Sequence, residues 1–121
     1  MSPRDWRLRI EDILESINNI QNYIKDMSFE EFAEDTKTIR ASAYEISIIG
    51  ESAGRIPAEL QEKYPQVPWI KMKEMRNIII HEYFRVDPAV VWQTATQNLS
   101  PLIPILQAIL KEKILVLLIL I

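Results

Sequence analysis

The chain has 121 residues, a length that suits one domain with a substantial hydrophobic core. Hydrophobic residues make up 48% and charged residues 26%, as in ordinary globular proteins, and the lack of cysteine excludes disulfides, a thiolate nucleophile and a cysteine-based zinc site. Two glycines nearly exclude a phosphate-binding glycine loop, and a single histidine argues against a transition-metal site. Because the formal net charge is −3, any contact with nucleic acid would have to be local.

The N-terminal segment predicts a long amphipathic helix. Apolar residues recur at steps of three and four, with charged residues between them. These apolar positions are Trp6, Ile10, Ile13, Leu14, Ile17, Ile20 and Ile24. Ser28 and Glu31 then have the spacing of a capping box, which predicts a short helix carrying Phe29 and Phe32. The first six residues form no apolar signal segment, so we expect a cytoplasmic location.

A second long helix is predicted from about Thr36 to Arg55. Gly50 and Gly54 lie four positions apart on one face of this helix, where another helix backbone can approach closely. An internal helix crossing is the favoured interpretation, and a crossing between subunits stays open as the alternative.

The following segment predicts a short helix and a third main helix. Pro57 suits the first position of a short helix that continues to Tyr64. The third main helix is predicted to run from Trp69 to about Tyr83.

The C-terminal third predicts a helix that prolines interrupt. Asp87 and Pro88 fit an N-cap and a first helical position, and Pro101 and Pro104 are expected to kink or break the helix that follows. Because no strand-like alternation appears, the predicted fold is all-α, an up-and-down bundle of four or five helices with short connections.

The last eight residues, Ile114–Ile121, are all aliphatic. This run is too short to span a bilayer, and it has no basic polar face, so we expect no membrane partner and give little weight to membrane-surface contact. The run could instead cover a groove in the core, mediate association or be an extension without a native role. We therefore divide the chain into a domain at 1–110 and an apolar tail at 111–121.

The candidate site is Met75–Tyr83, which contains the only histidine of the chain. On a straight helix, Arg76 and His81 would point about 140° apart, a poor arrangement for joint action within one chain. Asn77 and His81 would lie within about 40° of each other. Either the helix is irregular here, or a two-fold dimer brings a second copy of the motif to the same place.

These side chains suit RNA cleavage without a metal ion. A histidine can exchange a proton with a ribose hydroxyl or a leaving oxygen near neutral pH, and an arginine can hold the scissile phosphate. The tyrosine hydroxyl can donate to phosphate or be modified. The structural alternative is a lone helical histidine, a surface arginine and a tyrosine at the rim of the core.

The pattern Arg76-Asn77-x-x-x-His81-x-Tyr83 resembles the Arg-x-x-x-x-His-x-Tyr signature of HepT-like toxins, which are all-helical members of the HEPN superfamily. Upstream and downstream segments are also similar to that family, and the resemblance covers about residues 4–110. The segments are Ile48–Ala53, Ile56–Leu60, Val67–Trp69, Asp87 and Val91-Trp92.

This resemblance implies a homodimeric, metal-independent endoribonuclease without a cofactor, the toxin of a type VII-like toxin–antitoxin pair. Arg76 and His81 would be catalytic, Asn77 would be a supporting polar residue, and RNA would be the substrate. The partner would be an MntA-like nucleotidyltransferase antitoxin that silences the toxin by adenylylating Tyr83. The alternative is a catalytically inactive helical dimer that serves as a binding module or as the protein substrate of the nucleotidyltransferase.

Overall fold

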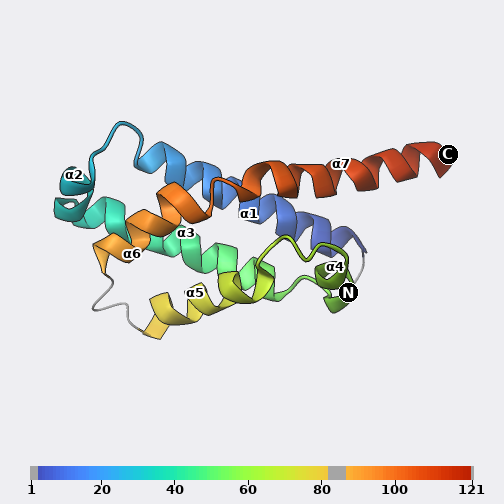
Figure 1. The fold of residues 1–121 in the computed structure, drawn as a ribbon, viewed down its shortest axis with the longest axis horizontal. Helices are drawn as coiled ribbons and strands as arrows, with labels where there is room; N and C mark the ends of the chain where they lie inside the picture. The colour runs from blue at the N-terminus through green and yellow to red at the C-terminus, as the bar shows by residue number, and fades with distance from the viewer. Residues whose placement is uncertain (1–2, 82–86, 121) are drawn as a thin grey trace.

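Four long helices form an up-and-down bundle in the computed structural model, which describes residues 3–81 and 87–120. The four are α1 (Pro3–Tyr23), α3 (Thr36–Gly54), α5 (Trp69–His81) and α7 (Leu102–Leu120). They run in alternating directions along the long axis of the molecule (Figure 1). Short segments join them: α2 (Phe29–Glu34), α4 (Ala58–Lys63), α6 (Pro88–Gln93) and the π-helix η2 (Thr94–Asn98). No strand occurs in 3–81 or 87–120, which confirms the all-α prediction.

The core lies where α3 packs between α1 and α5, with α7 closing over α1. The isoleucine stripe predicted on the N-terminal helix is buried, with Ile10, Ile13 and Ile20 completely shielded from solvent. The other long helices contribute the rest of the core. Their buried apolar residues include Ile46, Ile49, Ala53, Met72, Ile79, Leu102, Leu106 and Ile109.

The predicted capping box at the start of α2 is confirmed. The Ser28 hydroxyl accepts a hydrogen bond from the Glu31 backbone N–H at 3.1 Å, and the Ser28 backbone N–H donates to the Glu31 carboxylate at 3.0 Å. This cap orients α2 so that Phe32 is completely buried, with its ring 5.1 Å from that of Trp92. The contact joins α2 to α6 at one end of the bundle (Figure 1).

Pro88 and Pro57 were both predicted to occupy the first position of a helix, and the structure confirms this for Pro88 alone. Asp87 and Pro88 begin α6 as predicted, and the Asp87 carboxylate accepts from the Ala89 N–H at 2.9 Å. Pro57 is the N-cap residue of α4, with ψ of 143°, so its predicted place at the first helical position is wrong by one residue.

The helix that begins at Pro88 is interrupted before it reaches Pro101, because α6 passes directly into the π-helix η2. Thr94 and Thr96 each donate a hydroxyl hydrogen bond of 2.8 Å to a carbonyl four residues earlier, a contact that bends helices. Pro101 lies in the turn between η2 and α7, as expected for a helix breaker. Pro104 is the third residue of α7 and breaks nothing, because first-turn N–H groups have no acceptor within the helix. The prediction that Pro104 kinks or breaks a helix is therefore wrong.

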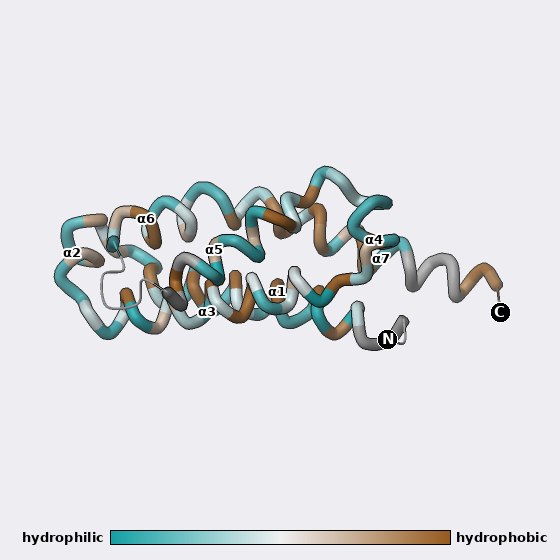
Figure 2. Tube along the Cα trace, turned by 90° about the horizontal axis from the view of Figure 1, so that it is seen from below, coloured by the Kyte–Doolittle hydropathy of each residue, from teal (hydrophilic) through white to brown (hydrophobic). Residues whose placement is uncertain are grey.

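The apolar tail continues α7 to Leu120 without interruption across the expected boundary at residue 110. It projects beyond the end of the bundle (Figures 1 and 2). Leu118, Ile119 and Leu120 are 64%, 81% and 77% exposed, so these three residues do not cover a core groove. In residues 3–81 and 87–120, no helix has the length and apolar character needed to cross a membrane.

Candidate active site

The site is built on the crossing of α3 and α5. A Cβ placed on Gly50 would lie 2.7 Å from the Met72 carbonyl oxygen and 3.2 Å from the Arg76 Cα, and still closer to the Arg76 Cβ. Only glycine therefore fits here without movement of α5. The favoured interpretation of Gly50 as an internal crossing point is confirmed, and the crossing fixes the position of Arg76.

Polar contacts constrain the guanidinium of Arg76. Its Nε lies 3.8 Å from the Glu51 carboxylate, and its Nη1 donates to the Asn77 side-chain oxygen at 3.4 Å. The Nε atom is buried and has no hydrogen-bond partner among the described residues, although the side chain as a whole is 34% exposed. Packing against Gly50, the charge contact with Glu51 and the hydrogen bond to Asn77 thus hold Arg76 in place.

The same Glu51 carboxylate also accepts a hydrogen bond from Arg55, one helical turn further along α3. The distance from Arg55 Nη2 to Glu51 Oε1 is 3.0 Å, and both side chains are about half exposed. Glu51 therefore lies between two arginines that come from different helices.

A hollow of about 220 Å³ opens beside these residues. Its lining combines the two glycines of α3 with three cationic side chains and one carboxylate. The residues are Gly50, Glu51, Gly54, Arg55, Lys73 and Arg76. The sequence prediction found Arg76 but missed Glu51, Arg55 and Lys73. The four-residue spacing of the glycines was the available signal, because it marks the face of α3 that α5 approaches.

The predicted site residues are described to different extents. Asn77 is exposed, and its side-chain oxygen accepts a hydrogen bond from Arg76, while its supporting role stays a prediction. His81 is the last residue of α5, but its side chain lies outside the described part of the structure, as does the whole of Tyr83. Since α5 is a regular α-helix from Trp69 to His81, an irregular helix between Arg76 and His81 is not found.

Two larger hollows lie elsewhere and are mainly apolar. One of about 450 Å³ runs between α4 and the start of α5, beside Trp69 and Ile70. The other, of about 340 Å³, lies between α3, α5, η2 and α7, beside Met72 and Leu99. Neither hollow includes Arg76, so neither belongs to the candidate active site.

Comparison with known proteins finds a matching family and relatives along most of the chain. The family described as "Ribonuclease HepT-like" matches residues 13–109, a stretch that contains the whole α3–α5 crossing. The "Probable ribonuclease HepT" of Thermococcus cleftensis is 38% identical over 93 residues, which cover 77% of this chain and 84% of that protein. A Methanocaldococcus jannaschii protein named as a candidate RNase is 34% identical over 112 residues, 93% of each chain. No solved structure matches the chain significantly.

Proposed function

This chain belongs to the HepT-like ribonuclease family, and we propose that it is an endoribonuclease with an active site built on Arg76 and His81. The observation that carries the proposal is the fixed place of Arg76 where α3 and α5 cross. Gly50 allows the Arg76 backbone to lie directly against α3, and the Arg76 Nε has no hydrogen-bond partner among the described residues. The guanidinium side chain is 34% exposed, so its outer N–H groups can donate to an anionic ligand.

In the proposed reaction, Arg76 holds the scissile phosphate and stabilises the negative charge that develops in the transition state. His81 exchanges protons with the attacking 2′-hydroxyl or the leaving oxygen, a role that the imidazole group of histidine can perform near neutral pH. Asn77 supports Arg76 through their contact of 3.4 Å. We infer that no metal ion or cofactor takes part.

The proposed active unit is a homodimer. On the regular helix α5, the directions of Arg76 and His81 differ by about 140°, so one copy is poorly arranged to act on one phosphate. A two-fold axis beside α5 would place two copies of the motif in one cleft. Arg76 of one subunit would then act with His81 of the other.

We further propose that the protein is the toxin of a type VII-like toxin–antitoxin pair. The antitoxin would be an MntA-like nucleotidyltransferase that transfers AMP to Tyr83. Each AMP adds a bulky anion two residues from His81, where it would repel the RNA phosphate. Silencing would thus act on substrate binding, without the need to unfold the site.

The proposal is tested by RNA cleavage with the purified full chain in EDTA. The unmodified protein is expected to cut, and His81→Ala is expected to abolish cleavage while leaving the circular dichroism spectrum and melting temperature unchanged. Lys71→Gln is a matched control, because Lys71 is exposed on α5 and does not line the hollow beside Arg76. Full cleavage by His81→Ala would refute the proposed mechanism.

The alternative function is an inactive dimer that acts as a binding module or as the nucleotidyltransferase's protein substrate. The acidic net charge of −3 favours it, because the charge offers no general attraction for RNA. It predicts Tyr83 adenylylation, detectable by mass spectrometry, in a protein that never cuts RNA. Cleavage by the unmodified chain would exclude it.

A further inference from the structure

The hollow beside Arg76 has a composition that the proposed cleavage chemistry does not itself require. It brings Arg55 and Lys73 next to Arg76, and among the described residues that line it one carboxylate, that of Glu51, opposes these three cations. We propose that this hollow is a phosphate subsite, which binds an RNA backbone phosphate next to the scissile one. This inference rests on the proposed ribonuclease function and adds Arg55 and Lys73 as substrate-binding residues.

Each of the two glycines of α3 packs against one cationic residue of α5. Gly50 lies against the Arg76 backbone, and an added Cβ at Gly54 would meet the Lys73 side chain at 3.3 Å. Residues three apart on a helix are neighbours on its surface, so Lys73 and Arg76 form a short cationic row along α5. Arg55 extends this row from the end of α3. Such a row fits the repeated phosphates of a single RNA strand.

The Glu51 carboxylate occupies the position that an anionic ligand would take. It is within hydrogen-bond distance of Arg55 at 3.0 Å but 3.8 Å from the Nε of Arg76. Because Glu51 and Arg55 are about half exposed, their ion pair is weak and readily exchanged. An RNA phosphate can accept two parallel hydrogen bonds from an arginine and so replace this carboxylate.

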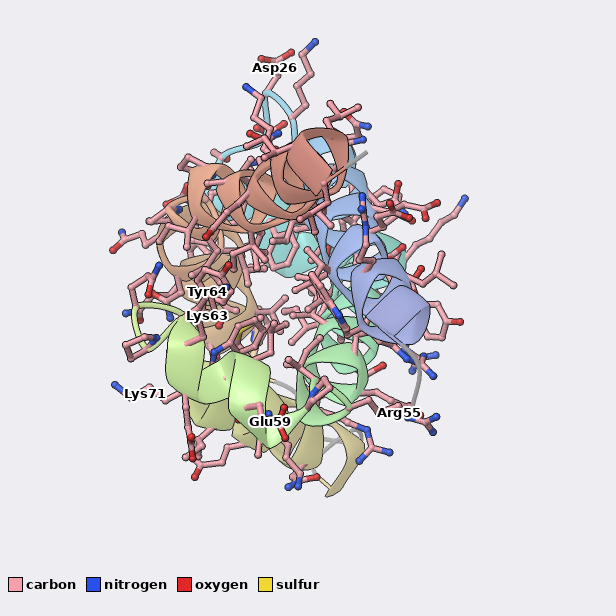
Figure 3. The ribbon with its side chains drawn as sticks, turned by 90° about the vertical axis from the view of Figure 1, so that its right-hand side faces the viewer. Asp26, Arg55, Glu59, Lys63, Tyr64 and Lys71 are labelled. Atoms are coloured by element: carbon pink, nitrogen blue, oxygen red, sulfur yellow. The ribbon has the colours of Figure 1, made fainter. Side chains whose placement is uncertain are left out.

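Exposed cationic residues that lie outside the hollow provide matched controls. Arg55 and Lys71 project toward opposite sides of the bundle when it is viewed from its right-hand end (Figure 3). Lys71 lines the two larger apolar hollows and is absent from the lining of the phosphate subsite. Arg40 is an exposed arginine near the start of α3, and it is also absent from that lining.

The test is the binding of a fluorescent single-stranded RNA to the full chain, in a His81→Ala background that prevents cleavage. Arg55→Gln and Lys73→Gln are each expected to weaken binding about tenfold, the effect of losing a charge-assisted hydrogen bond. Each is also expected to reduce the slope of log Kd against log salt concentration by about 0.7, the contribution of one phosphate contact on a single strand. Lys71→Gln and Arg40→Gln should change affinity less than about twofold.

Glu51→Gln changes binding in the opposite direction. Removal of the competing carboxylate should tighten RNA binding about threefold. Weaker RNA binding by Glu51→Gln would refute the proposal that an RNA phosphate replaces the Glu51 carboxylate.

The outcomes separate this inference from the proposed function. If the unmodified chain cuts RNA while Arg55→Gln and Lys73→Gln bind like the two controls, the subsite is refuted and the ribonuclease remains. If the unmodified chain neither binds nor cuts RNA, both proposals fail.

Discussion

Gly50→Ala tests whether the α3–α5 crossing sets the position of Arg76. The new methyl group would meet the Met72 carbonyl oxygen at 2.7 Å and the Arg76 Cα at 3.2 Å. These are backbone atoms, which cannot rotate away as the end of a flexible side chain can. The substitution therefore requires α5 to move away from α3.

The size of the effect follows from two opposing contributions. Alanine gains about 1 kcal/mol over glycine in helix propensity. Overpacking costs about 1–3 kcal/mol, and a contact with backbone belongs at the upper end of that range. The expected net loss is about 2 kcal/mol in the free energy of unfolding, or roughly 8 °C in melting temperature for a chain of this size.

Gly54→Ala is the matched control, one turn further along the same face. The three atoms nearest to its Cβ, at 3.3–3.6 Å, all belong to the Lys73 side chain, which is exposed and can rotate into solvent. Because Gly54 is the last residue of α3, the gain in helix propensity is also small. We expect a change within about 0.5 kcal/mol.

The free energies of unfolding of both variants are measured in urea at one protein concentration, with circular dichroism as the probe. RNA cleavage by folded Gly50→Ala is also expected to fall, since a displaced α5 carries Arg76 with it. Equal stability and equal cleavage in Gly50→Ala and the unmodified chain would refute the role assigned to the crossing.

Three further predictions concern the elements that hold the bundle. Ser28→Ala removes the capping box and should cost about 1 kcal/mol in urea denaturation. A hydrogen bond from the Ser28 backbone holds the pKa of the Glu31 carboxyl below its usual 4.5, so the stabilisation from this cap is present at neutral pH and is lost as the pH falls through the lowered pKa. Amide exchange in α2 should therefore speed up, relative to the long helices, as the pH falls through that range, and unchanged relative protection of α2 would contradict the assignment. Phe32→Ala should cost about 3–5 kcal/mol, because the ring is completely buried against Trp92, and a loss below about 1 kcal/mol would contradict that packing. Burial, followed by the hydrogen bond to Glu112, raises the pKa of Tyr64 to about 12, so its contribution to stability is complete below pH 10 and is lost as the pH rises through 12. Ultraviolet titration should show a late tyrosine phase that Tyr64→Phe removes, and an unchanged late phase in that variant would refute the assignment.

Local sequence signals predicted the long helices well. The isoleucine spacing of α1 has the period of a helix surface, and the structure buries that stripe. The Ser28–Glu31 pair and the Asp87–Pro88 pair act within one turn, so their effect is visible in sequence. The π-helix η2 was missed because a single wide turn leaves no periodic pattern. Pro104 was misjudged because its effect depends on where α7 begins.

The candidate site was predicted only in part. The motif spacing singled out Arg76 and Asn77, whose side chains contact each other, and their catalytic and supporting roles stay predictions. Glu51 is more than 20 positions away from Arg76, and nothing in its own segment indicates a charge contact with that residue. That contact depends on the close approach of two helices, which Gly50 permits but does not specify.

Mixed dimers of two inactive variants test the central claim most directly, that Arg76 and His81 cut RNA together across a two-fold axis. Arg76→Ala and His81→Ala chains with different tags are co-expressed, and the mixed dimer is purified through both tags. Each variant alone should fail to cut, whereas the mixed dimer has one site with both residues intact and should recover roughly half of the unmodified dimer's rate. A mixed dimer that cuts no better than either parent, beside an active unmodified protein, would contradict the shared site. Absence of cleavage by the unmodified protein would contradict the proposed ribonuclease activity itself.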